Sequence, residues 1–141
     1  MDNLSLYRKN RHACYLLQYH LVVVTKYRYP VITEPIKARL IQISQELFSG
    51  WKCPILEINT EPDHIHILFE APPQIQLSKL INNYKTVSSR LIRKEFHSFL
   101  STFYWKPYFW SESYFICTVS ERSTAIIQSY IKNQAANSAQ T

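Results

Sequence analysis

The sequence predicts an α+β fold built on an antiparallel sheet. Two observations indicate this class. Runs rich in β-branched and aromatic residues alternate with runs whose apolar residues recur every three or four positions, and the order is strand, helix, strand, strand, helix, strand, with one further helix. A length of 141 residues suits one ordinary domain. We expect that domain to span residues 1–134 and a disordered tail to span 135–141.

The first half supplies three strands and one helix. Residues 15–28, YLLQYHLVVVTKYR, are rich in β-branched and aromatic types and predict the first strand. A helix should begin after Thr33, a typical N-cap, and end at Gly50, which we expect to cap it in the left-handed conformation. Residues 51–61 and 64–71 predict two further strands, close enough in sequence to form a hairpin.

The second half supplies two helices around one strand. Residues 77–96 have apolar side chains at helical spacing, 113–120 (SYFICTVS) predict the fourth strand, and 123–134 predict the last helix. This order is the βαββαβ arrangement of ferredoxin-like folds, an antiparallel sheet with both main helices on one face. The additional C-terminal helix is then free to cover the other face.

The composition favours some classes of partner and excludes some classes of cofactor. A net charge of +6 and a 14% aromatic content favour an anionic partner such as nucleic acid. Gly50 is the only glycine, so phosphate-binding glycine loops and a nucleotide cofactor are excluded. The three cysteines form no CxxC pair, and neither a signal peptide nor a membrane-spanning run is present, so we expect a cytoplasmic protein without membrane attachment.

The run EPDHIHILFE contains the candidate metal site. Side chains alternate across a strand, so His64 and His66 point to one face while Ile65 and Ile67 point to the other. The two imidazoles could be a hydrogen-bonded pair on a half-exposed sheet, or two of the ligands of a cation. Two histidines are an incomplete metal site, so the second interpretation requires another ligand from elsewhere.

The last predicted helix offers candidates for that ligand. Tyr130 and Gln134 are four residues apart and therefore share one face of the helix. A glutamine carbonyl can bind a hard cation, and a tyrosine hydroxyl would lie beside it. Spacing alone does not distinguish Tyr130 from the other nine tyrosines.

Five stretches together resemble the single-tyrosine HUH transposases, the transposase A of small hairpin-ended bacterial insertion sequences. They are YHLVVVTKYR, EPDHIHIL, YKTVSSRLIR, FWSESYFICTVS and IIQSYIKNQ. The resemblance implies that His64, His66 and Gln134 bind a metal and that Tyr130 is the nucleophile. It also implies a homodimer that cleaves and rejoins hairpin-bearing single-stranded DNA through a 5′-phosphotyrosine intermediate, with a tyrosine helix that can complete the histidine pair of either subunit.

A mixed set of imidazole and amide ligands suits Mg²⁺ or Mn²⁺. Six basic residues are candidates for phosphate contacts, and three aromatic residues are candidates for base stacking: Lys26, Arg28, Lys79, Lys85, Arg90 and Arg93, with Trp105, Tyr108 and Trp110. Two alternatives remain. One is a non-catalytic nucleic-acid-binding module of the RNA-recognition type. The other is a rolling-circle initiator or relaxase, which usually has a longer chain.

Overall fold

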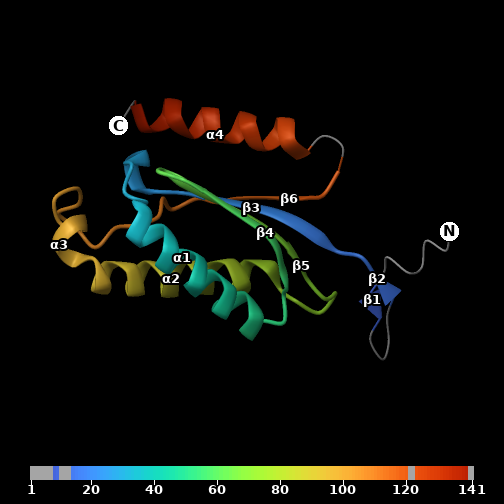
Figure 1. The fold of residues 1–141 in the computed structure, drawn as a ribbon. Coiled ribbons are helices and arrows are strands. Elements are labelled where there is room, and N and C mark those ends of the chain that lie inside the picture. The colour runs from blue at the N-terminus through green and yellow to red at the C-terminus, as the bar shows by residue number, and fades with distance from the viewer. Residues whose placement is uncertain (1–7, 10–13, 121–122, 140–141) are drawn as a thin grey trace.

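A four-stranded antiparallel sheet forms the centre of the molecule (Figure 1). The computed structural model describes residues 8–9, 14–120 and 123–139. The strands of this sheet, in spatial order, are β4 (Ile55–Glu61), β5 (His64–Glu70), β3 (Gln18–Val24) and β6 (Phe115–Thr118). A separate two-stranded ribbon pairs β1 (Arg8–Lys9) with β2 (Cys14–Tyr15). The predicted α+β class is confirmed, and β4 and β5 form the predicted hairpin.

Helices cover both faces of the sheet (Figure 1). The helical elements are η2 (Lys26–Arg28), α1 (Glu34–Gly50), α2 (Leu77–Glu95), α3 (His97–Leu100) and α4 (Ser123–Ala139). Helices α1 and α2 lie together on one face, and α4 lies across the opposite face. Helix α4 continues beyond the expected domain end at residue 134. Among the residues that the structure describes, we find no helical segment whose length and hydropathy would let it span a bilayer.

The main core lies between the sheet and helices α1 and α2. On β5, the side chains of Ile65, Ile67 and Phe69 are fully buried in this core, so the alternating side chains of His64 and His66 face α4 instead. A much smaller cluster joins α4 to the other face of the sheet; its buried members are Val22, Val24 and Ile127. The tyrosine-bearing helix is therefore attached by far fewer apolar contacts than α1 or α2.

Several local expectations differ from the structure. The second strand begins at Ile55 rather than at residue 51, and the fourth spans Phe115–Thr118 rather than 113–120. The first strand ends at Val24 rather than at residue 28, because Tyr27 and Arg28 adopt left-handed backbone angles, with φ of 57° and 56°. The prediction that Gly50 caps its helix in the left-handed conformation was wrong. Gly50 is the last helical residue, and Lys52 takes the left-handed angle instead, with φ of 59°.

Candidate metal and tyrosine site

The histidine pair faces a cavity of about 250 Å³ between the sheet and α4. Strand β5 positions both imidazoles, because its alternate side chains anchor it to the main core. The lining residues come from β3, β4, β5 and α4: His20, Asn59, Glu61, His64, His66, Thr124, Ile127, Gln128 and Ile131. This is the face that the alternation in HIHILFE predicts.

Asp63 holds the ring of His64 in one orientation. The Nδ1 atom of His64 lies 2.8 Å from Oδ1 of Asp63, and a carboxylate only accepts hydrogen bonds, so Nδ1 carries the proton. The unprotonated Nε2 of His64 is then the nitrogen with a lone pair for a cation. Arg28 binds the second carboxylate oxygen, with 2.7 Å between its Nε and Oδ2 of Asp63.

His66 has a third histidine as its neighbour. Nδ1 of His20 on β3 lies 2.8 Å from Nε2 of His66, and the two rings are stacked with centroids 5.0 Å apart. Burial lowers the pKa of His66, and the imidazoles of His20 and His64 act in the same direction. Burial also lowers the pKa of His20. Both groups therefore favour the neutral form, which is the form that binds metals.

Sequence reasoning missed His20 and Asp63 as parts of this site. The signal for His20 was available, because the alternation in QYHLVVV places it on the same face as Val22 and Val24. Asp63 is adjacent to the histidine pair in sequence, but its interaction with Arg28 joins residues 35 positions apart. Such a long-range pair leaves no local pattern in a single sequence.

Tyr130 lies on a different side of α4 from the cavity. The residues of α4 that line the cavity are spaced by three or four positions and form one face, and Tyr130 projects about 110° around the helix axis from the middle of that face. Its ring packs on Phe115 of β6, with centroids 4.9 Å apart, and its hydroxyl lies 3.4 Å from Oγ of Ser113. Burial raises the pKa of Tyr130, and the hydrogen bond with Ser113 partly offsets this.

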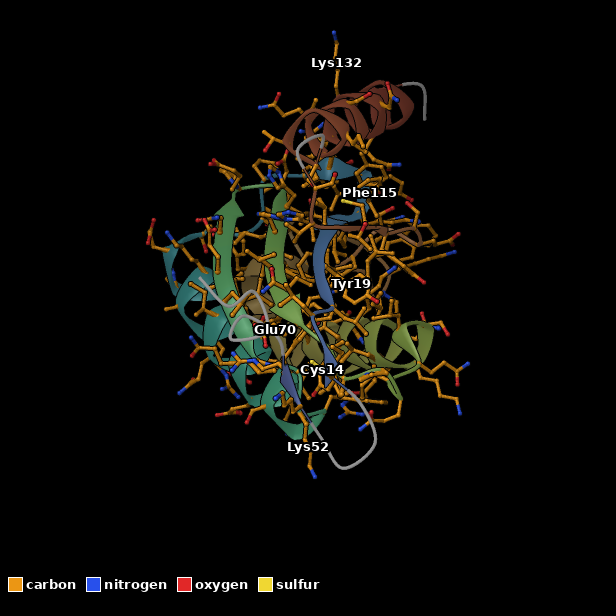
Figure 2. The ribbon with its side chains drawn as sticks, turned by 90° about the vertical axis from the view of Figure 1, so that its right-hand side faces the viewer. Cys14, Tyr19, Lys52, Glu70, Phe115 and Lys132 are labelled. Atoms are coloured by element: carbon orange, nitrogen blue, oxygen red, sulfur yellow. The ribbon has the colours of Figure 1, made fainter. Side chains whose placement is uncertain are left out.

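The structure therefore does not bring Tyr130 and Gln134 into the histidine cavity of the same chain. Gln134 follows Tyr130 by one turn, about 70° from the middle of the cavity face, and neither residue lines the cavity. Figure 2 shows Phe115 beneath α4 and Lys132 pointing from α4 away from the sheet. Ile127, Tyr130 and Ile131 all pack against the sheet, but Ile127 and Ile131 border the histidine cavity whereas Tyr130 packs on β6.

The donor atoms present fit a metal ion only in part. His64 offers Nε2, whereas Nε2 of His66 is engaged by His20. In the described part of the chain, no group of three or more histidine, cysteine, aspartate or glutamate side chains could hold an ion. A neutral imidazole pair beside oxygen donors suits a divalent cation, but the pair needs further ligands from elsewhere.

The predicted phosphate-binding residues have different surroundings. Arg90 and Arg93 line a second cavity of about 580 Å³ with Trp105 and Tyr108, whereas Trp110 is buried in the main core. The ammonium group of Lys26, another residue predicted to bind phosphate, lies over the ring of Tyr108, and Lys79 is exposed. Nζ of Lys85 donates to the carbonyl oxygens of Glu112 and Ser113. Burial lowers the pKa of Lys85.

Comparisons with known proteins agree on one family. The model of the IS200-like transposases matches residues 13–134. The ISDra2 transposase TnpA of Deinococcus radiodurans is 32% identical over 127 residues, which cover 90% of each chain. The transposase for insertion sequence element IS200 of Salmonella typhimurium is 32% identical over 123 residues, which cover 87% of this chain and 80% of the relative.

Solved structures give the same result for the fold. The crystal structure of a putative transposase from Deinococcus radiodurans superposes with a TM-score of 0.84 at 32% identity, over 90% of this chain and 97% of the other. A REP-associated tyrosine transposase bound to a REP hairpin superposes with a TM-score of 0.51 at 10% identity, over 86% of this chain and 67% of the other. The second likeness concerns the fold alone.

Proposed function

Because this chain belongs to the family of IS200-like transposases, we propose that it cleaves and rejoins single-stranded DNA at hairpin-bearing ends. The observation that carries this proposal is the cavity beneath the tyrosine-bearing helix, into which His64 and His66 project side by side. The membership in a transposase family supports DNA as the substrate.

Tyr130 is the proposed nucleophile. Its hydroxyl oxygen attacks the phosphorus of a phosphodiester and loses its proton, while the bond from phosphorus to the 3′ oxygen breaks. The 3′ oxygen takes up a proton and leaves as a hydroxyl, and the 5′ phosphate remains on the tyrosine. A 3′ hydroxyl from another end then attacks this ester and releases Tyr130. The ester conserves the energy of the original linkage, so rejoining requires no nucleotide.

His64, His66 and Gln134 are the proposed ligands of Mg²⁺ or Mn²⁺. When bound, the ion would polarise the scissile phosphate and orient it for in-line attack. Asp63 keeps Nε2 of His64 available for this role. The hydrogen bond between Nε2 of His66 and Nδ1 of His20 must break before this Nε2 can bind the ion. Gln134 would contribute its side-chain carbonyl oxygen.

We propose that each complete site combines the histidine pair of one subunit with Tyr130 and Gln134 of the other. This assignment is supported by the direction of Tyr130, which faces Phe115 and Ser113 rather than the cavity of its own chain. Burial raises the pKa of Tyr130, so this position favours the neutral phenol over the phenolate. A homodimer supplies two such sites, as joining two DNA ends requires.

A covalent adduct tests the nucleophile. Wild-type protein, Tyr130→Phe and the control Tyr15→Phe are incubated with hairpin-bearing single-stranded DNA and Mn²⁺, then separated on a denaturing gel. We expect an adduct with the wild type and the control and none with Tyr130→Phe. An adduct that persists in Tyr130→Phe would remove Tyr130 from the mechanism.

Mixed dimers test the shared site. Tyr130→Phe is co-expressed with a chain that carries His64→Ala and His66→Ala, and the heterodimer is purified with two different tags. If the site is shared between subunits, one of the two sites has both the tyrosine and the histidine pair, and adduct formation returns to about half of the wild-type level. A heterodimer as inactive as either parent would place Tyr130 with the histidines of its own chain.

A further inference from the structure

The side chain of Arg28 connects the tyrosine-bearing helix to the histidine strand. Its Nε donates to Oδ2 of Asp63 at 2.7 Å, and its Nη1 donates to the backbone carbonyl of Ile131 on α4. Oδ1 of the same carboxylate accepts the proton of His64 Nδ1 at 2.8 Å. A continuous chain of hydrogen bonds thus runs from the residue after Tyr130 to the ring of His64.

The backbone around Arg28 is shaped for this contact. Tyr27 and Arg28 both have positive φ, at 57° and 56°, although neither is glycine. Two consecutive left-handed residues are unfavourable for L-amino acids and persist only where the surrounding structure holds them. The turn η2 that contains them contacts α4 directly. Most of the Arg28 side chain is shielded, with 16% of it exposed.

Few other interactions attach α4 to the sheet near this point. Ile127 is its buried apolar anchor, and Tyr130 and Ile131 are only partly buried against the same cluster. Ile131 also lines the histidine cavity. A bond to the carbonyl of Ile131 therefore constrains α4 at the position where it passes over the metal-site residues.

Building on the proposed function, we infer that Arg28 is a positioning residue for two sites at once: it orients the His64 that its own chain gives to one site, and it holds the helix whose Tyr130 completes the other. Through Asp63 it keeps the Nδ1 proton on His64 and directs Nε2 into the cavity. Through the carbonyl of Ile131 it fixes the distance of α4 from the sheet and the rotation of α4 about its own axis. A guanidinium suits this role because its planar fork serves two acceptors at once, whereas an ammonium group lacks that fork.

The test measures the hydrogen exchange of α4 and the affinity for Mn²⁺ in separate experiments. Arg28→Ala and Arg28→Lys are compared with wild type. Arg39→Ala is the matched control, because Arg39 of α1 forms a 2.7 Å ion pair with Glu95 of α2, and these helices lie on the face of the sheet opposite to α4 (Figure 1). Hydrogen exchange of the α4 amides is followed in metal-free protein. Calorimetry gives the affinity for Mn²⁺, and thermal melting verifies that each variant is folded.

We expect Arg28→Ala to accelerate exchange of the amides around residue 131 at least tenfold. It should weaken Mn²⁺ binding by about tenfold, the lower end of the 10–100-fold range for loss of the partner of a metal-binding histidine, because Asp63 itself remains. Arg28→Lys should resemble Arg28→Ala, and Arg39→Ala should resemble wild type. Asp63→Asn should weaken Mn²⁺ binding in the same way, and it serves as a second variant if Arg28→Ala does not fold.

Unchanged α4 exchange and unchanged Mn²⁺ affinity in Arg28→Ala would overturn the inference. Loss of hairpin binding alone would do the same and would make Arg28 a phosphate ligand instead. The exchange measurement needs neither metal nor DNA. If wild-type protein forms no adduct while Arg28→Ala still loosens α4, the proposed chemistry fails but the link between Arg28 and α4 stands.

Discussion

Replacing Ile127 by alanine should release α4 from the sheet while leaving the rest of the fold intact. Ile127 is 8% exposed and packs on Val22 and Val24 in the small cluster. Buried isoleucine-to-alanine changes cost about 2–5 kcal/mol, and we take the lower end, about 2 kcal/mol, because the cluster is small and borders a cavity. Since about 1.4 kcal/mol is a factor of ten, the docked state of α4 should lose about 30-fold in population relative to the undocked state.

Hydrogen exchange is the assay for this change. Amides of α4 in Ile127→Ala should exchange up to about 30-fold faster, whereas those of β3 and β5 should be nearly unchanged because they belong to the main core. Ile126→Ala is the matched control, because Ile126 is the adjacent residue of the same helix and is 43% exposed. Equal acceleration in α4 and β3 would refute independent release of α4, and no acceleration in α4 would refute the role of Ile127 as its anchor.

Three further predictions concern the core, the histidine pair and the cysteines. Tyr84→Phe removes a 2.7 Å hydrogen bond to Ser44 in the main core and should lower the free energy of unfolding, measured with urea, by about 1 kcal/mol. Because burial depresses the pKa of His66 below its ordinary 6.5, the metal-free protein should lose stability as the pH falls below about 6.5, and His66→Gln should flatten that slope. Burial raises the pKa of Cys53 to about 11, so at pH 8 a thiol reagent should modify exposed Cys14 much faster, and unfolding should abolish the difference.

The sheet and its helices follow from patterns that a single sequence displays. Alternation in HIHILFE identifies both faces of β5, and apolar spacing identifies α1 and α2. The errors occur where nonlocal structure determines the backbone. Nothing in the residue types of Tyr27, Arg28 or Lys52 indicates left-handed angles. Gly50 would suit such an angle, but it lies two residues before the position that adopts one.

The candidate site could be predicted only as separate parts. Spacing places Tyr130 and Gln134 on one side of a helix, and alternation places His64 and His66 on one side of a strand. Which side of α4 docks depends on the burial of Ile127 against Val22 and Val24, a contact between distant segments. The residue pattern of α4 does not reveal which side of the helix docks, because apolar and polar residues are mixed around it.

The placement of α4 bears on how the proposed activity should depend on protein concentration. The helix lies over the histidines of its own chain while turning Tyr130 toward β6. If the site is shared between subunits as we propose, a single subunit would hold Tyr130 apart from His64 and His66. DNA cleavage would then require two subunits to meet, so its rate should fall steeply as the protein concentration falls.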